Sequence, residues 1–332
     1  MNSGRRLASA ARLGVAAGRS RRALPWLLVW ALLVASATAA APSGLSLLAP
    51  GVHVHHGALE EWGPGNDGDV SNSGVVIGER CVAVIDSGGS AVAARRLVAG
   101  VRRLTRLPVC YVINTHAHPD HLLGNSVFED AARDAGDPAP SFVGHARLRA
   151  GLAARGPAYL NALRRDFGTE AASAVRLVAP TVVVEKSLHI DLGGRKLELT
   201  AWPTAHTDAD LSVLDLQSGT LFLGDLLFIE HTPVVDGRLK GWLGVLAQLR
   251  AGPAVRIVVP GHGAASTVWP GALDAQQRYL ERLQSDVRRA IKEGVTLPQA
   301  LERVRPDTPR WRLLDVFHQR NVSAAYAELE WE

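Results

Sequence analysis

Residues 114–121 concentrate side chains that bind metal ions. They read Asn-Thr-His-Ala-His-Pro-Asp-His, so three imidazoles and one carboxylate fall within six residues. They directly follow the apolar run 107–113, which is typical of a buried strand. Surface histidines in a polar loop are the alternative, but four ligand-type residues at the end of one apolar strand favour a metal site.

The spacing divides these residues into two pairs. His116 and His118 are two residues apart and project to the same side of extended backbone, where they can share one cation. The proline that follows fixes its own φ and donates no N–H, which favours a sharp bend. Asp120 and His121 come after that bend and can meet a second cation. Imidazole nitrogen and carboxylate oxygen suit Zn²⁺ first, with iron or manganese as alternatives.

Three further polar residues stand where later apolar runs end. They are His206, Asp225 and His262, and each has Gly, Pro or Thr beside it. Each alone is typical of a turn residue. Their presence becomes informative beside the first stretch, because two zinc ions need more than four ligands.

The apolar runs predict a mixed α/β domain that positions these residues. The β-branched runs 73–78 and 80–85 predict a hairpin, and helical periodicity over 91–104 precedes a strand at 108–114. This βαβ order places residues 114–121 at the carboxyl end of a strand, where open α/β sheets place their sites.

Other elements are expected along the rest of the chain. The consecutive runs from 181 to 223 predict an antiparallel second sheet, and 122–137 is expected to be irregular. Strands are expected at 47–55, 141–144, 181–185, 188–192, 196–202, 211–216, 220–223 and 254–259, and helices at 156–174, 241–249, 273–292, 297–304 and 309–326.

The first 39 residues predict a secretory signal. They contain six arginines and no acid, then an apolar run over 23–35 broken only by Pro25, and then Ala37-Thr38-Ala39. This is the order of a charged region, an apolar region and a small-residue cleavage site. The pair Arg21-Arg22 also suits a twin-arginine signal, so both export routes stay open. We expect a periplasmic or secreted protein without a stable membrane span after signal removal, since no later apolar run approaches about 18 residues.

Removal of this signal changes the charge of the chain. The whole chain has a formal charge of +4 and a pI of about 9.4. Loss of the six arginines leaves about −2. The basic pI therefore describes mostly the signal, and no nucleic-acid partner is expected.

Cys81 and Cys110 are too few for a disulfide scaffold or a thiolate zinc site. Both fall in apolar runs that are predicted as strands. We expect buried free thiols, with a disulfide as the alternative that an oxidising compartment permits.

The ligand-type residues together carry a resemblance to a known family. The order His-x-His-x-Asp-His, then His206, Gly-Asp225 and Gly-His262, resembles the metallo-β-lactamase superfamily over about residues 52–263. The resemblance implies an α/β fold, an αββα four-layer sandwich, here with extra C-terminal helices. After the predicted signal at 1–39, the chain is then expected to contain a metallohydrolase domain at 40–265 and a helical extension at 266–332. The resemblance also implies a zinc ligand set: His116, His118 and His206 on one ion, Asp120, His121 and His262 on the other, and Asp225 bridging both.

Other motifs narrow the resemblance. Zinc β-lactamases typically have cysteine or serine in place of Asp225, whereas glyoxalase II and other thioesterases have aspartate there. The chain further resembles the exported quinoprotein relay system zinc metallohydrolases, which are associated with pyrroloquinoline-quinone dehydrogenases. The motifs are Asn72-x-Gly74, Cys81-Val-Ala-Val-Ile-Asp86-Ser-Gly-Gly, Asp236-Gly-x-Leu-x-Gly-Trp242, Asn321-Val, Tyr326 and Glu330-Trp331. A quinoprotein dehydrogenase system is therefore the implied context, and the resemblance implies no particular substrate.

The resemblance implies zinc-dependent hydrolysis of an ester, thioester or amide-like bond in a small molecule. A metal-bridging hydroxide would attack, and Asp120 would orient it. Two functions remain as alternatives: a single-iron persulfide-type dioxygenase, and a non-catalytic periplasmic partner of a quinoprotein dehydrogenase.

Some further side chains are candidates for supporting roles. Asp86 and Thr115, or Asp208 and Asp210, are expected to hold ligand imidazoles through their second nitrogen. His231 and Lys240 are candidates for substrate contact, although a structural or exposed position suits both better.

Overall fold

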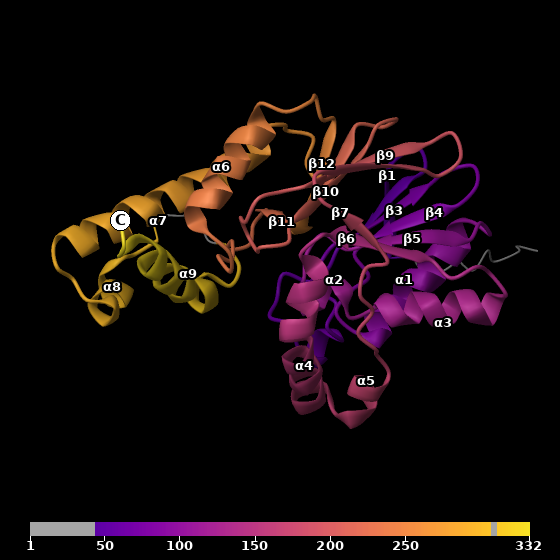
Figure 1. Cartoon of the computed structure of the whole chain (residues 1–332), viewed down its shortest axis with the longest axis horizontal. Helices are drawn as coiled ribbons and strands as arrows, with labels where there is room; N and C mark the ends of the chain where they lie inside the picture. The colour runs from indigo at the N-terminus through magenta and orange to yellow at the C-terminus, as the bar shows by residue number, and fades with distance from the viewer. Residues whose placement is uncertain (1–43, 307–310) are drawn as a thin grey trace, which may run out of the picture. The chain divides into compact units, whose positions relative to one another are not determined.

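Two β-sheets form the centre of the part of the chain that the computed structural model describes, residues 44–306 and 311–332 (Figure 1). The predicted signal at 1–39 lies outside these residues. Helices separate β4 from β5, β5 from β6, β6 from β7 and β11 from β12, whereas β7 to β11, over residues 182–228, follow one another without a helix.

The first sheet has seven strands in the order β1 to β7. Its first four strands are antiparallel and β4 to β7 are parallel, so the predicted hairpin is β3 with β4. The single strand expected at 47–55 is instead two, because Gly51 turns the chain with φ 73°. The strands are β1 Leu45–Ala49, β2 Val52–His55, β3 Ser73–Ile77, β4 Val82–Ile85, β5 Val109–Ile113, β6 Ser141–His145 and β7 Val182–Val184.

The second sheet has five strands in the order β12, β11, β10, β9, β8. Strands β8 to β11 are antiparallel, as predicted, and β12 lies parallel to β11. The expectation is wrong for 181–185, because β7 pairs in parallel with β6 in the first sheet. The strands are β8 Ser187–Asp191, β9 Lys196–Ala201, β10 Leu211–Asp215, β11 Thr220–Phe228 and β12 Ile257–His262.

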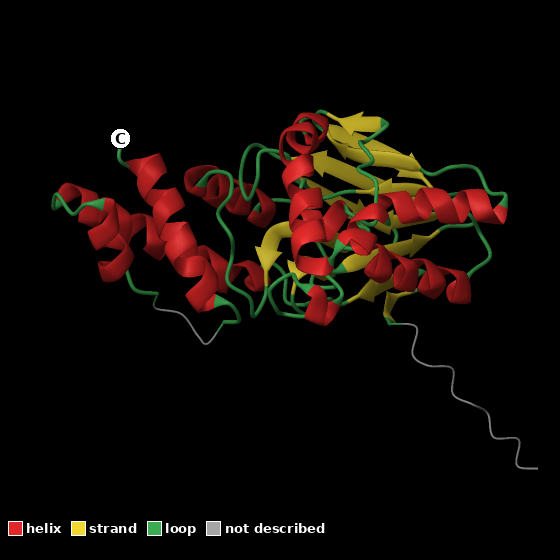
Figure 2. Cartoon of the chain, turned by 90° about the horizontal axis from the view of Figure 1, so that it is seen from below, coloured by secondary structure: helices red, strands yellow, loops and turns green. Residues whose placement is uncertain are grey.

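Apolar side chains of the two sheets face each other and form one core. Val54 of the first sheet and Leu197 and Val213 of the second are fully buried in it. Helices α1 Ala91–Leu104, α3 Asn125–Ala135 and α4 Leu148–Phe167 cover the outer face of the first sheet. Helices α6 Leu239–Arg250 and α7 Asp274–Lys292 pack against the second. Seen from below, helices in red lie across the near side of the yellow strands (Figure 2). The predicted αββα sandwich is therefore confirmed, and burial of these apolar faces is what drives the layers together.

One expectation of irregular chain and one expected helix start are wrong. Most of the segment 122–137, predicted as irregular, is helix α3, which follows the short α2 Pro119–Leu122, buries Val127 and Phe128 and is capped by Gly136 with φ 72°. The helix predicted from 156 begins earlier, as α4, and continues through Pro157 before the short α5 Thr169–Ser173. The sparse apolar residues of α3 and the proline of α4 obscure both helices in the sequence.

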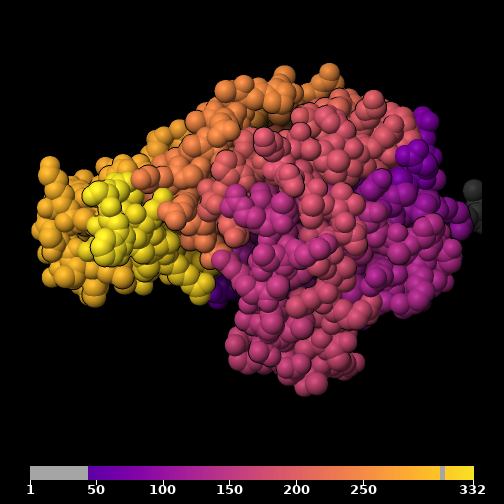
Figure 3. Space-filling model, in the orientation of Figure 1, coloured from indigo at the N-terminus to yellow at the C-terminus, as the bar shows by residue number. Residues whose placement is uncertain are grey.

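Helices α7, α8 Leu297–Arg303 and α9 Leu314–Leu329 follow the last strand. They share an apolar core with α6 and β11, in which Trp242, Leu280 and Val322 are fully buried. The space-filling view shows α9, in yellow, against the orange surface of the preceding segments (Figure 3). Within residues 44–306 and 311–332, no helix has the length and apolar character needed to cross a bilayer.

Cys81 and Cys110 form a disulfide, so the expectation of free thiols is wrong. Cys81 immediately precedes β4 and Cys110 lies in the neighbouring parallel strand β5. That pairing brings their Cα atoms to 5.8 Å, within the range that a disulfide spans. The contact depends on strand pairing, which the spacing of two cysteines does not reveal.

Arg195 and Asp215 form a buried ion pair in the second sheet, and the stability of the fold should be sensitive to loss of one partner. Arg195 and Asp215 lie 2.7 Å apart at 6% and 0% exposure, and Arg195 also donates to the carbonyl of Pro50. Arg195→Ala leaves a buried carboxylate without its cation and should lower the free energy of unfolding by about 3–5 kcal/mol. Urea denaturation measures the loss. The double variant Arg195→Leu/Asp215→Leu should lose less, and a single variant as stable as the wild type would contradict this role.

Candidate metal centre

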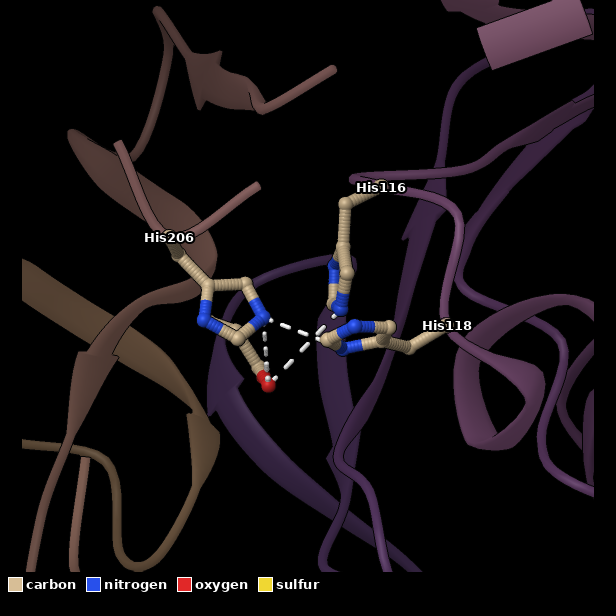
Figure 4. Close-up of side chains that lie close together, drawn as sticks. His116, His118 and His206 are labelled. Carbon is tan, nitrogen blue, oxygen red and sulfur yellow. Dashed lines mark hydrogen bonds and ion pairs between the residues drawn. The ribbon is translucent and has the colours of Figure 1, made fainter. Parts of the chain in front are cut away.

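The seven ligand-type side chains meet at the ends of strands from both sheets. His116, His118, Asp120 and His121 follow β5, His206 follows β9, Asp225 lies in β11 and His262 ends β12. They form two groups, and within each the candidate ligand atoms lie within 4.8 Å of one another. The first ligand group is His116, His118, His206 and Asp225; the second is Asp120, His121 and His262. The structure thus brings together all seven residues singled out from the sequence. Figure 4 shows the three histidines of the first ligand group, whose rings converge on one point.

The carboxylate of Asp225 lies between the two groups. Its Oδ2 is 3.7 Å from His116 Nε2 and 3.3 Å from His206 Nε2. Its Oδ1 is 3.1 Å from His121 Nε2 and 3.4 Å from His262 Nε2. One oxygen therefore faces each group, which is the arrangement of a bridging carboxylate.

Close approach of β12 to this carboxylate requires glycine at 261. A Cβ built on Gly261 would lie 1.9 Å from Asp225 Oδ1, closer than any real contact. The Gly-His sequence at the end of β12 therefore serves two needs, since one residue makes room for Asp225 and the next supplies an imidazole.

Three atoms at the centre of the site are buried and make no hydrogen bond of good geometry to the described residues, although two of them, His121 Nε2 and Asp225 Oδ1, lie 3.1 Å apart. They are His116 Nε2, His121 Nε2 and Asp225 Oδ1. Buried polar atoms in folded proteins almost always have partners, because an unsatisfied one costs about 1–3 kcal/mol. A cation between these atoms would satisfy all three. Nitrogen and carboxylate oxygen donors fit zinc, iron or manganese, so the residues present fit a bound metal.

The second nitrogen of each ligand imidazole is anchored, which orients the first toward the centre. Nδ1 of His121 bonds Asp86 Oδ2 at 2.7 Å, Nδ1 of His206 donates to the carbonyl of Val234 at 2.7 Å, and Nδ1 of His262 donates to that of Val70 at 2.9 Å. A carbonyl only accepts, so His206 and His262 carry their proton on Nδ1 when neutral and present Nε2 as a lone pair.

The remaining two imidazoles are held by side chains. His116 Nδ1 lies 3.0 Å from the hydroxyl of Thr115, which donates to Asp86 Oδ2 at 2.7 Å. His118 is turned the other way: its Nδ1 faces the first ligand group, and its Nε2 bonds Asp236 Oδ2 at 3.1 Å. The candidates Asp86 and Thr115 therefore contact ligand imidazoles.

The other pair of supporting candidates does not hold ligand rings. Asp208 is exposed, and Asp210 accepts hydrogen bonds from the amide and hydroxyl of Thr207. Sequence reasoning missed the anchors Val70, Val234 and Asp236. Backbone carbonyls carry no sequence signal, whereas Asp236 stands in a motif that was noted without a role.

Their surroundings lower the pKa of some ligand imidazoles and raise that of others. Burial lowers the pKa of His116 well below its ordinary value and that of His206 to about 4. Burial also acts to lower the pKa of His262, but Asp225 and Asp120 outweigh it and raise that pKa to about 9. The same carboxylates raise the pKa of His121 against burial. In the metal-free protein, the second ligand group therefore holds protons where a cation would sit.

A cavity of about 790 Å³ opens onto both ligand groups, with Asp120 and Asp225 in its lining. Its walls include Trp62 of the loop after β2, Ala162 of α4 and Phe317 of α9. The loop with Trp62, for which the sequence left a flap or plain surface open, therefore borders the site.

The two candidates for substrate contact differ in position. His231 lines the cavity and stacks on His262 with ring centroids 4.9 Å apart. Its Nδ1 donates to the carbonyl of Thr232, and burial lowers its pKa to about 4, so the ring is neutral near pH 7 with a bare Nε2. Lys240 pairs with Glu332 at 2.7 Å and is not among the described residues that line the cavity.

A family model described as the Metallo-beta-lactamase superfamily matches residues 66–262, more than half of the chain. The chain belongs to the metallo-beta-lactamase superfamily. The match contains all seven ligand-type residues and ends at His262. None of the curated protein sequences matches the chain.

Solved structures share this superfamily fold at low identity. The inverting sec-alkylsulfatase Pisa1 from Pseudomonas sp. is 20% identical, with a TM-score of 0.65 over 85% of this chain and 49% of that one. The chain therefore spans about half the length of that protein. A beta-lactamase domain protein from Burkholderia ambifaria is 20% identical, with a TM-score of 0.62 over 89% of both chains. A metallo-beta-lactamase family protein from Thermus thermophilus is 19% identical, with a TM-score of 0.59 over 86% and 94%.

Metal binding near pH 7 should release protons from the second ligand group. The raised pKa values of His121 and His262 mean that both rings are protonated in the metal-free protein, and a metal displaces these protons. Calorimetric titration with Zn²⁺ in buffers of different ionisation enthalpy should show release of at least about two protons at pH 7.

The raised pKa of His262 determines how proton release on metal binding changes with pH. Its protonation stabilises the metal-free fold below the ordinary value of 6.5, and this contribution is lost as pH rises through about 9. Proton release on metal binding should therefore shrink between pH 7 and 10. Equal release at both pH values, or none at pH 7, would contradict this charge distribution.

Proposed function

We propose that this chain is an exported dinuclear zinc hydrolase that acts on an ester, thioester or amide-like bond of a small molecule. The observation that carries the proposal is the buried carboxylate of Asp225, with one oxygen toward each ligand group. The complete second group, Asp120, His121 and His262, favours two ions over the single iron of a dioxygenase.

The two ligand groups would each hold one zinc ion, with Asp225 shared between them. A bound zinc pair lowers the pKa of a water molecule toward 7 and polarises the bond under attack. Burial of four of the five ligand rings, and the anchors on the second nitrogens of all five, would keep the donors in place before substrate arrives.

Asp120 is the residue that we assign to orienting the attacking water. Its carboxylate borders the cavity at 14% exposure, and His121 and His262 hold its pKa well below the ordinary range despite burial. It can therefore accept a hydrogen bond from water at neutral pH. Its backbone carbonyl accepts from Ser71 Oγ at 2.6 Å, which fixes the turn on which it stands.

His231 would contact substrate rather than protonate it. Because its Nδ1 proton is bound to Thr232 and its Nε2 is bare at neutral pH, the ring can only accept a hydrogen bond from a group in the cavity. The leaving group would take its proton from solvent, since the cavity is open to it.

We also propose that the chain belongs to the quinoprotein relay branch and works in the periplasm beside a quinoprotein dehydrogenase. The motifs that carry this resemblance include residues that support the site. Asn72 donates to the carbonyls of Pro260 and Gly263 on either side of His262, and Asp86 and Asp236 hold ligand imidazoles. Export is supported by the pattern of residues 1–39 and by the disulfide, which persists in oxidising compartments.

Hydrolysis should depend on Asp120. Zinc-loaded protein is screened on thioesters, lactones, esters, β-lactams and, because of the structural likeness to an alkylsulfatase, secondary alkyl sulfates. On any substrate that is turned over, Asp120→Ala should lower kcat/KM by about 10²–10⁴-fold, because water loses its orienting carboxylate.

Asp208→Ala is the matched control, since it removes an exposed aspartate two residues from His206. It should retain wild-type activity. Activity that survives Asp120→Ala unchanged would exclude the proposed role, and metal analysis that finds one iron per wild-type chain would favour oxygen chemistry instead.

A further inference from the structure

The loop between β11 and α6, residues 229–238, is in contact with two imidazoles of the first ligand group. The carbonyl of Val234 accepts from His206 Nδ1 at 2.7 Å, and Asp236 Oδ2 bonds His118 Nε2 at 3.1 Å. The amide of Asp236 also donates to the carbonyl of His206 at 3.1 Å. The conformation of this β11–α6 loop therefore sets where both rings point.

The opposite side of the same loop is held by one buried side chain of α9. Asn321 Oδ1 accepts from the amide of Val235 at 2.9 Å, and its Nδ2 donates to the carbonyl of Pro233 at 2.6 Å. These two contacts flank Val234. Asn321 is 0% exposed, and its remaining donor binds the hydroxyl of Tyr279 at 2.9 Å. The side-chain amide of Asn321 thus bonds the backbone on both sides of Val234, whose carbonyl anchors His206.

Further contacts bind the ends of the loop to the C-terminal helices. The amide of Arg312 donates to the carbonyl of Glu230 at 2.9 Å, and Glu328 of α9 accepts from the amide of Leu239 at 2.6 Å. Glu230 and Leu313 both have φ of 59°, a left-handed conformation that non-glycine residues adopt only when their surroundings impose it. The loop conformation is therefore determined by its contacts and not by local preference.

The second ligand group meets this loop at its first residues, where the amide of Ile229 donates to the carbonyl of His262 and the ring of His231 stacks on that of His262. The nitrogens of its rings are anchored elsewhere. His121 is anchored by Asp86 at the end of β4, and His262 by the carbonyl of Val70 before β3. Neither anchor lies in the β11–α6 loop. Loss of the hydrogen bonds from Asn321 to the loop should therefore lower the metal affinity of the first ligand group and leave the ring anchors of the second in place.

We propose that Asn321 is a positioning residue for the metal site: through the β11–α6 loop, it sets the affinity of the group His116, His118 and His206 for its ion. The C-terminal helices then belong to the metal centre as well as to the fold. This inference rests on the proposed zinc centre, since it concerns how one of its two ions is held.

Three variants of the full chain separate positioning from packing. Asn321→Ala removes both contacts with the loop. Asn321→Asp keeps the shape of the side chain but places an acceptor against the carbonyl of Pro233. Tyr279→Phe is the control, because it removes the hydroxyl shared by Asn321 and His318 inside the helices and leaves the contacts with Pro233 and Val235 in place.

The experiment measures Zn²⁺ and Co²⁺ binding to metal-free protein by competition with a chromophoric chelator, and the visible spectrum of the Co²⁺ form. In both Asn321 variants, one of the two binding steps should weaken by about tenfold or more while the other stays within about twofold. Their Co²⁺ spectra should change at the weakened step. Tyr279→Phe should melt at a lower temperature than the wild type but bind both ions with unchanged affinity and spectrum.

The outcomes distinguish this inference from the proposed function. Wild-type protein that binds no metal would overturn the zinc centre itself. Wild-type protein that binds two ions, together with Asn321 variants that bind both equally well, would overturn only the positioning role. Equal weakening by Tyr279→Phe would assign the effect to helix packing and would also overturn it. If Asn321→Ala does not fold, the near-isosteric Asn321→Asp decides.

Discussion

The buried carboxylate of Asp225 is the constraint on which the rest of the site depends. It is 4% exposed, and both of its oxygens face imidazole nitrogens from two different sheets. A buried charge is tolerated only when opposite charge compensates it. Protons on His121 and His262 compensate it in the metal-free protein, and cations would do so in the loaded protein. The glycine at 261 leaves room for the carboxylate, and the close strand ends and anchored rings bring positive charge next to it.

The chemistry of the site could be predicted because ligand residues gather at places that the sequence marks. The motif 114–121 ends an apolar run, and His206, Asp225 and His262 stand at similar boundaries. What holds these rings could be predicted only in part. Asp86 is visible as an acid at a strand end, but the carbonyls of Val70 and Val234 belong to residues whose side chains give no hint of the role.

The fold shows the same division between local and long-range information. The helical period of the apolar residues in 91–104 predicts helix α1 with its observed bounds, and the structure adds that Ser90 caps its start. The partner of β7 was predicted wrongly, since a β-branched run of three residues has no preference for one sheet over the other. The disulfide, and the hydrogen bond of Asn321 with Val235 86 residues away, likewise depend on tertiary contacts. Hydrophobic periodicity shows which face of a helix or strand is buried, but not which other element covers that face.

The most direct test of the account is anomalous diffraction from crystals of zinc-loaded protein, with data on both sides of the zinc absorption edge. The account predicts two anomalous peaks about 3.5–4 Å apart, with Asp225 between them and ligand nitrogens about 2.0–2.1 Å from each. No peak at these side chains, or a single peak that leaves Asp120, His121 and His262 without a metal, would contradict it.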